Sequence, residues 1–257
     1  YSPGVPFNIE GEEDKTDFLL NKLKYFRGRG GGTPLREGLN KVGIYYHMNV
    51  SGNVERELRT SPLSNDEGGR CQQNFAIVFT DGAWNGRDPD FPRLRNPRAV
   101  TEDDNVDGDN GEPYADRWDE TLADVAMFYY ENDLAPDVPD EVPTSFIDKA
   151  QYQHMVTYGV SFGLAGKLDP ADYDLYNVDP TERKYPDWPR PGRNRVQENI
   201  DDLWHATVNG RGSFFSAKSP EEMARALEVV ISDVISRVGS GASVSINGEE
   251  RDTGLVV

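Results

Sequence analysis

The chain has 257 residues, of which 36% are hydrophobic and 11% aromatic, enough to bury the core of one large domain or two small ones. Its 27 basic and 45 acidic residues give a formal charge of −18, which disfavours nucleic acid and anionic membranes as partners and favours cations and basic partners. No apolar run approaches the roughly 20 residues that a membrane span needs.

The first quarter of the chain predicts a lead-in followed by two helices. Residues 1–16 are rich in proline, glycine and acids, which is typical of a flexible lead-in, and residues 17–26 predict a short helix. Thr33 is expected to cap a second helix that has Pro34 in its first turn. The helical spacing of apolar side chains predicts that its buried stripe consists of Leu35, Leu39, Val42 and Tyr46.

After a polar loop at residues 49–69, an apolar run at 74–80 predicts a buried parallel strand. The run ends on Asp81 and Gly82, which places a carboxylate at the carboxyl edge of the sheet, where open α/β sheets bind their ligands. The hydroxyl of Thr33 and the carboxylate of Asp81 are both oxygen donors. They could therefore converge on one hard cation, either magnesium or calcium.

After residue 81 helices alternate with strands, and two polar insertions, at residues 82–118 and 165–197, interrupt the series. Thr121 and Asp124 have the spacing of a capping box, and the helix that they start is expected to bury Leu122, Val125, Ala126 and Tyr129. The later elements are expected to be a strand at 155–163, a helix at 199–208, a strand at 213–217, a helix from 219 to 238 and a linker or small β segment at 239–257. Such alternation predicts an α/β fold, with a mostly parallel sheet and helices on both faces.

Several motifs resemble known families. Gly31-Gly32-Thr33-Pro34-Leu35 followed by Thr80-Asp81-Gly82 resembles a von Willebrand factor A domain, whose fold is Rossmann-like. Three further blocks resemble the PilY family of type IV pilus tip-associated proteins, namely residues 71–86, 122–130 and 202–212. The resemblance spans residues 17–240 and implies that 17–238 form one domain of this type, although its sheet is incomplete at the N-terminal side.

The resemblance also implies a partial metal site. In von Willebrand A domains the matching Thr and Asp complete a metal-ion-dependent adhesion site, so Thr33 and Asp81 are implied as ligands. The family's Asp-x-Ser-x-Ser motif is absent, and magnesium is expected here only if an upstream segment is present. The chain begins at Tyr1 and is expected to be a portion of a longer protein, with an upstream fragment lying against the strand at 75–79.

An acidic loop forms a second candidate metal site. Its spacing and Gly108 match the first half of an EF-hand loop, but Tyr114 occupies the twelfth position, so a complete EF-hand is excluded. The candidate calcium ligands are Asp103, Asn105, Asp107, Asp109 and Asp116, with Glu112 as an alternative. They can supply many of the six to eight oxygens that calcium takes. A solvated acidic loop without an ion is the competing interpretation.

Four further residues have more than one interpretation. His205 is expected to pack in the core in preference to binding a ligand, and Asp124 to cap its helix or accept a buried hydrogen bond. Arg211 lies between two glycines and would fix a turn or contact a partner. The lone Cys71 cannot form an intrachain disulfide, which leaves a thiol partner elsewhere or a buried, unreactive thiol.

By resemblance, the chain is expected to be a binding module without enzymatic activity, at the bacterial surface and the pilus tip. The implied function is metal-dependent adhesion in support of pilus assembly and surface attachment. The implied partners are pilus subunits (minor pilins) and a host or surface ligand. A structural assembly module without metal dependence is one alternative. A hydrolase that uses paired acids is another, although no fixed-spacing acid pair supports it.

Overall fold

The fold is built on a three-stranded parallel sheet with the strand order β1-β2-β3. A computed structural model describes residues 32–48, 61–63, 67–86 and 105–249, and separately residues 17, 20, 21, 24 and 25. The strands are β1 (Asn74–Thr80), β2 (Met155–Phe162) and β3 (Arg211–Ala217). The predicted parallel α/β fold is therefore confirmed, with an incomplete sheet.

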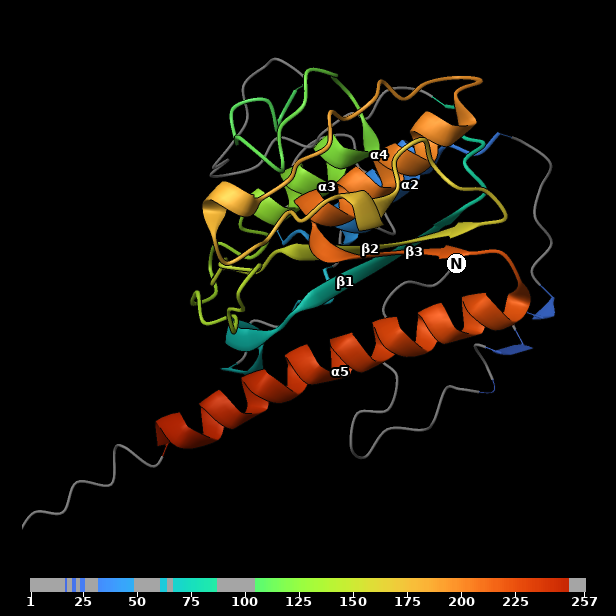
Figure 1. The fold of residues 1–257 in the computed structure, drawn as a ribbon. Helices are drawn as coiled ribbons and strands as arrows, with labels where there is room; N and C mark the ends of the chain where they lie inside the picture. Colours follow the sequence, from blue (N-terminus) through green and yellow to red (C-terminus); the bar gives the residue numbers. More distant parts are fainter. Residues whose placement is uncertain are drawn as a thin grey trace, which may run out of the picture.

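Helices cover both faces of this sheet (Figure 1). Those on one face are α2 (Leu35–Tyr46), α3 (Leu122–Glu131) and α4 (Val196–Asn209). The long helix α5 (Pro220–Glu249) crosses the other face. Short 3-10 turns lie at η2 (Glu67–Cys71), η3 (Pro170–Asp172) and η4 (Pro180–Glu182). Among residues 17–26, the four positions 17, 20, 21 and 24 are helical, as the sequence predicts.

The core centres on β2 and α3. Seven consecutive residues of β2 are buried, because helices pack on both of its faces. All residues of α3 from Leu122 to Tyr130 are buried, because α3 packs against α2, α4 and β2. The predicted capping box is confirmed: Thr121 Oγ1 accepts the N–H of Asp124, and the Asp124 carboxylate accepts the N–H of Thr121.

The start of α2 differs from the prediction in two respects. Thr33 does not cap the helix; the N-cap residue is Pro34, which has no side-chain hydrogen bond to offer. Val42 is 37% exposed, and Gly43 and Ile44 are buried in its place. The buried stripe is rotated because α2 packs its glycine against the ring of Tyr129 on α3.

The last helix is longer than the sequence predicts. It continues to Glu249, whereas a linker or small β segment is expected from residue 239. The glycines at 239, 241 and 248 suggest an earlier end, but glycine weakens a helix much less than proline does, and no proline occurs there. Residues 250–257 lie outside the described part of the chain. Two other elements begin earlier than predicted, α4 at Val196 and β3 at Arg211.

Strand β1 lies at an edge of the sheet. Within the described residues it pairs only with β2, and its Ile77 and Phe79 side chains are 39% and 42% exposed. An edge strand with apolar side chains is a template for pairing with another segment. None of the described helices has the length and apolar composition that a membrane-spanning helix requires.

Candidate functional site

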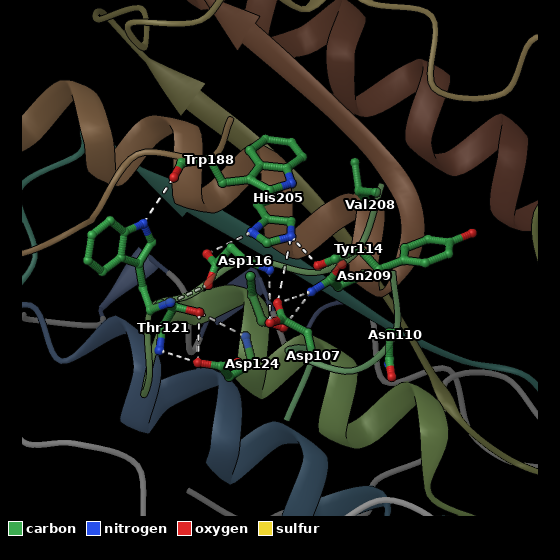
Figure 2. A network of polar contacts seen from close by, with 12 residues as sticks. Asp107, Asn110, Tyr114, Asp116, Thr121, Asp124, Trp188, His205, Val208 and Asn209 are labelled. Carbon is green, nitrogen blue, oxygen red and sulfur yellow. Dashed lines mark hydrogen bonds and ion pairs between the residues drawn. The ribbon is translucent and has the colours of Figure 1, made fainter. Parts of the chain in front are cut away.

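A buried polar network joins the acidic loop to α3 and α4 (Figure 2). His205 of α4 lies at its centre and is 1% exposed. Its Nε2 lies 2.6 Å from the carbonyl oxygen of Tyr114, and its ring stacks on Trp188 with the centroids 4.1 Å apart. Two carboxylates flank the imidazole: Asp107 Oδ2 lies 3.7 Å from Nε2, and Asp116 Oδ2 lies 3.5 Å from Nδ1.

Asp107 is the most constrained member of this network. Its side chain is fully buried; Oδ1 accepts the N–H of Asp116 at 3.3 Å, and Oδ2 accepts the amide of Asn209 at 2.9 Å. Asp116 Oδ1 in turn accepts the N–H of Trp118 at 2.6 Å. The acidic loop is therefore held to α4 through Asp107 and Asp116, two of the carboxylates that the sequence predicts as calcium ligands.

Two more carboxylates lie at the N-terminus of α3. Asp124 closes the capping box, and Asp202 of α4 accepts the N–H groups of Leu122 and Ala123, each at 3.1 Å. These contacts satisfy donors that have no partner within the helix, and the positive end of the helix dipole favours acids at this position. The prediction that Asp124 caps its helix is confirmed.

The network therefore combines four carboxylates with one imidazole, which contacts those of Asp107 and Asp116. Burial raises the pKa of Asp107 to about 6, against the opposing charge of His205. Burial, together with the charges of Asp107 and Asp116, raises the pKa of Asp124 to about 9. Burial also raises the pKa of Asp202 to about 7, although its two N–H bonds oppose this. Negative charge in excess of one imidazolium needs either protons or a cation to balance it.

The pKa of His205 is raised, which favours the charged form of the imidazole. Burial alone lowers the pKa of His205, but its contacts with Asp116 and Asp107 outweigh burial, so the pKa lies above its ordinary value. Because Nε2 donates to the Tyr114 carbonyl, Nδ1 is the ring nitrogen that faces the Asp116 carboxylate. The imidazolium form matches this arrangement, with one donor directed to each side.

We expect the melting temperature to fall as the pH rises from about 5 to about 9 when chelator removes divalent cations. The pKa values of Asp107, Asp124 and Asp202 are all raised above the unfolded value of 3.8, so the folded state binds more protons than the unfolded state. The stability that this provides is fully present below about pH 4 and is lost as the pH passes through the folded-state pKa values. Thermal unfolding at constant ionic strength measures it, and a melting temperature that rises over this range would contradict the assignment.

The network has the composition of a candidate cation site. One donor atom each from Asp107, Asp116 and His205 lies within 4.8 Å of the others. Asp124 Oδ1 and Asn209 Oδ1 are buried and have no hydrogen-bond partner among the described residues. These oxygens suit a hard cation such as calcium, which takes six to eight oxygen ligands. The imidazole would serve as a neighbouring charge, because its Nε2 is already bonded to Tyr114.

The other predicted members of the calcium loop are placed differently. Asp109 is exposed, and Asn105 directs its Nδ2 to the Asp116 carbonyl at 3.4 Å. Glu112 is also exposed, and Asp103 lies outside the described residues. Calcium binding by this loop stays a prediction. Of its described candidate ligands, Asp107 and Asp116 are the two that lie together beside His205.

Three residues of the network were not selected from the sequence as ligands: Asp202, His205 and Asn209. They lie three and four residues apart and so share one face of α4. A polar stripe on a helix that is buried along most of its length is a signal that periodicity analysis can detect. His205 lies in the core as predicted, but in a charged network and not among apolar side chains.

Thr33 lies just before α2, and Asp81 directly follows β1. Asp81 is exposed, and its Oδ1 accepts the N–H of Ala83 at 3.0 Å. The carbonyl of Thr33 accepts the N–H of Asn85 at 2.9 Å, which brings the start of α2 against the loop that follows β1. Magnesium at Thr33 and Asp81 stays a prediction; two protein oxygens would hold it weakly, because magnesium takes six ligands.

Comparison with known proteins identifies related sequences. The chain is 30% identical over 256 residues to the type IV pilus biogenesis factor PilY1 of Pseudomonas aeruginosa strain PAK, covering 88% of this chain and 21% of that protein. It is 27% identical over 245 residues to PilY1 of strain UCBPP-PA14, covering 87% and 20%. The chain is thus homologous to part of PilY1 and spans about a fifth of the length of these relatives.

No family model matches the chain, and no solved structure matches it. The von Willebrand A assignment therefore rests on the motifs and on the α/β fold with its incomplete parallel sheet.

Proposed function

We propose that this chain is a binding module of a PilY1-like protein that supports type IV pilus biogenesis and surface attachment from the bacterial surface. The observation that carries the proposal is the homology to PilY1 over 88% of the chain. The names of the relatives describe biogenesis factors, which favours binding over catalysis. Pilus subunits and a surface or host ligand are the partners that such a role implies.

The edge strand supports a position within a longer polypeptide. β1 has no strand on its outer side among the described residues, and its apolar side chains Ile77 and Phe79 are partly exposed. We propose that an upstream fragment of the same protein pairs with this edge. That strand would cover the exposed side chains and satisfy the backbone groups of β1.

We further propose that calcium balances the charge of the buried network. Asp107 and Asp116 would hold the ion, and the unsatisfied oxygens of Asp124 and Asn209 belong to the same network. The ion would supply positive charge at the junction of the acidic loop, α3 and α4, and so hold the loop in its folded position. Its role would be structural support for the binding surface and not the adhesive contact itself.

The biological test uses the full-length protein in its own bacterium. Deletion of the segment that corresponds to this chain should abolish surface pili and attachment, with the truncated protein still secreted. Asp107→Asn should reduce both in low calcium, whereas Asp109→Asn, in the same loop but exposed, should leave them unchanged. Normal piliation after the deletion would refute the assembly role.

Two other functions predict different outcomes. A structural module without metal dependence is favoured by the absence of the Asp-x-Ser-x-Ser motif, and piliation of the Asp107→Asn strain that is independent of calcium would support it. A hydrolase receives little support, because the carboxylates of the network are buried and bonded to backbone N–H groups.

A further inference from the structure

A cavity beyond the carboxyl end of β1 concentrates arginine and tryptophan in a chain whose overall charge is −18. It has a volume of about 570 Å³ and lies where the segments that precede α3 and α4 approach the first turn of α2. The basic and aromatic side chains that line it are Arg36, Arg117, Arg190, Arg193, Trp84 and Trp118. Asp119 and Glu120 also line it, so four cations and two anions leave a net charge of +2.

The tryptophans contact three of the four guanidinium groups. The guanidinium of Arg36 lies 4.5 Å from the ring centroid of Trp84. Those of Arg117 and Arg190 lie 5.0 and 5.5 Å from the ring centroid of Trp118. Such stacking orients the planar N–H fork of arginine. The stacked arginines also cover ring faces on which a sugar would stack. The cavity therefore offers a ligand mainly N–H donors.

Part of this lining is fixed before any ligand binds. Arg36 is 9% exposed and donates to the carbonyl of Glu120 at 2.5 Å. Glu120 has φ of 59°, a left-handed conformation that is uncommon for a residue other than glycine and often found at binding sites. Trp84 is 8% exposed, and its buried indole N–H has no hydrogen-bond partner among the described residues. A ligand that brings an acceptor oxygen would satisfy this donor.

We propose that this cavity binds the carboxylates of an acidic peptide segment. Arginine forks match the planar carboxylate in a bidentate manner. The lining carries a net charge of +2, and Arg117 also lies 3.5 Å from the carboxylate of Asp187 outside the lining. This balance suits one or two carboxylates and not a polyanion. Recognition here needs no metal ion, so the cavity is separate in mechanism from the predicted site at Thr33 and Asp81. The proposal does not depend on a role in pilus assembly.

The test is calorimetric titration of the whole chain, in chelator, with a blocked Gly-Glu-Gly-Glu-Gly peptide, its Gln counterpart and inorganic phosphate. The Glu peptide should bind, and the Gln peptide should bind at least about tenfold more weakly, the ratio expected when one charge-assisted pair is lost. Arg190→Gln, an exposed lining residue, should weaken binding of the Glu peptide by a similar factor. Arg225→Gln, an exposed arginine on α5 with the same change in charge, should have no effect.

Other outcomes would overturn the proposal. These are no binding of the Glu peptide in chelator, equal binding of the Gln peptide, or equal loss in the Arg225→Gln control. Tighter binding of phosphate than of the Glu peptide would assign the cavity to a phosphate group instead. Arg36→Lys keeps the charge but removes the fork, so undiminished binding by this variant would also count against bidentate recognition.

Discussion

Replacing His205 by leucine should lower the free energy of unfolding by about 3–5 kcal/mol at neutral pH in chelator. The imidazole contacts Asp107 and Asp116, and both carboxylates are buried. Its removal would leave two buried acids without a counter-charge and the carbonyl of Tyr114 without its donor. Loss of one partner of a buried ion pair costs much more than loss of an exposed one.

Denaturant unfolding measures this loss, and two further variants identify its cause. Asp109→Asn, an exposed change in the same loop, should alter stability by less than about 0.5 kcal/mol. Asp107→Asn introduced into the His205→Leu background should recover part of the loss, because it removes an unpaired charge. A loss below about 1 kcal/mol for His205→Leu would mean that the imidazole does not carry the charge balance.

Replacing each of two glycines of α2 by alanine should change the free energy of unfolding in opposite directions. A Cβ atom at Gly43 would lie 2.3 Å from Cγ of Tyr129, closer than any real contact, so Gly43→Ala should destabilise the fold by about 1–3 kcal/mol or more. The ring cannot move aside, because Tyr129 is fully buried and its hydroxyl donates to Asn40 Oδ1 at 2.5 Å. The expected cost is therefore that of forcing α2 and α3 apart.

At Gly38 an added Cβ meets no atom within 4 Å, so Gly38→Ala should stabilise the helix by about 0.5–1 kcal/mol. Thermal unfolding of both variants measures the contrast. Equal effects of the two substitutions would show that α2 does not pack on Tyr129 through Gly43.

Local signals were the part of the fold that the sequence could predict. The capping box of Thr121 and Asp124 requires residues only three positions apart, and the structure has it as predicted. The apolar runs that became β1 and β2 were also predicted, because a short continuous apolar run indicates a strand before its partners are known. Only β2 is buried as predicted; in β1, Ile77 and Phe79 are partly exposed. The rotation of α2 could not be predicted, since it depends on where Tyr129 packs.

The members of the candidate site that lie close together in the sequence could be predicted, and those brought in by tertiary packing could not. Asp107 and Asp116 belong to one short acidic loop, so sequence spacing was enough to group them. Asn209 lies 102 residues from Asp107, and its contact with Asp107 arises from tertiary packing of α4 against that loop. The cavity lined by Arg36, Trp118 and Arg190 likewise draws on three distant segments, none of which carries a motif by itself.

Terbium luminescence tests most directly whether the buried network holds a calcium-like cation. Terbium replaces calcium at oxygen-rich sites, and Trp188 stacks on His205 close enough to sensitise an ion held by Asp107 and Asp116. Excitation of tryptophan should give saturable terbium emission that excess calcium abolishes. The Asp107→Asn variant should lose this emission, and the Asp81→Asn variant should retain it. The Trp188→Phe variant should lose most of the emission, but calcium should still raise its melting temperature. Emission that survives Asp107→Asn but disappears with Asp81→Asn, or an identical melting temperature in calcium and in chelator, would contradict the account.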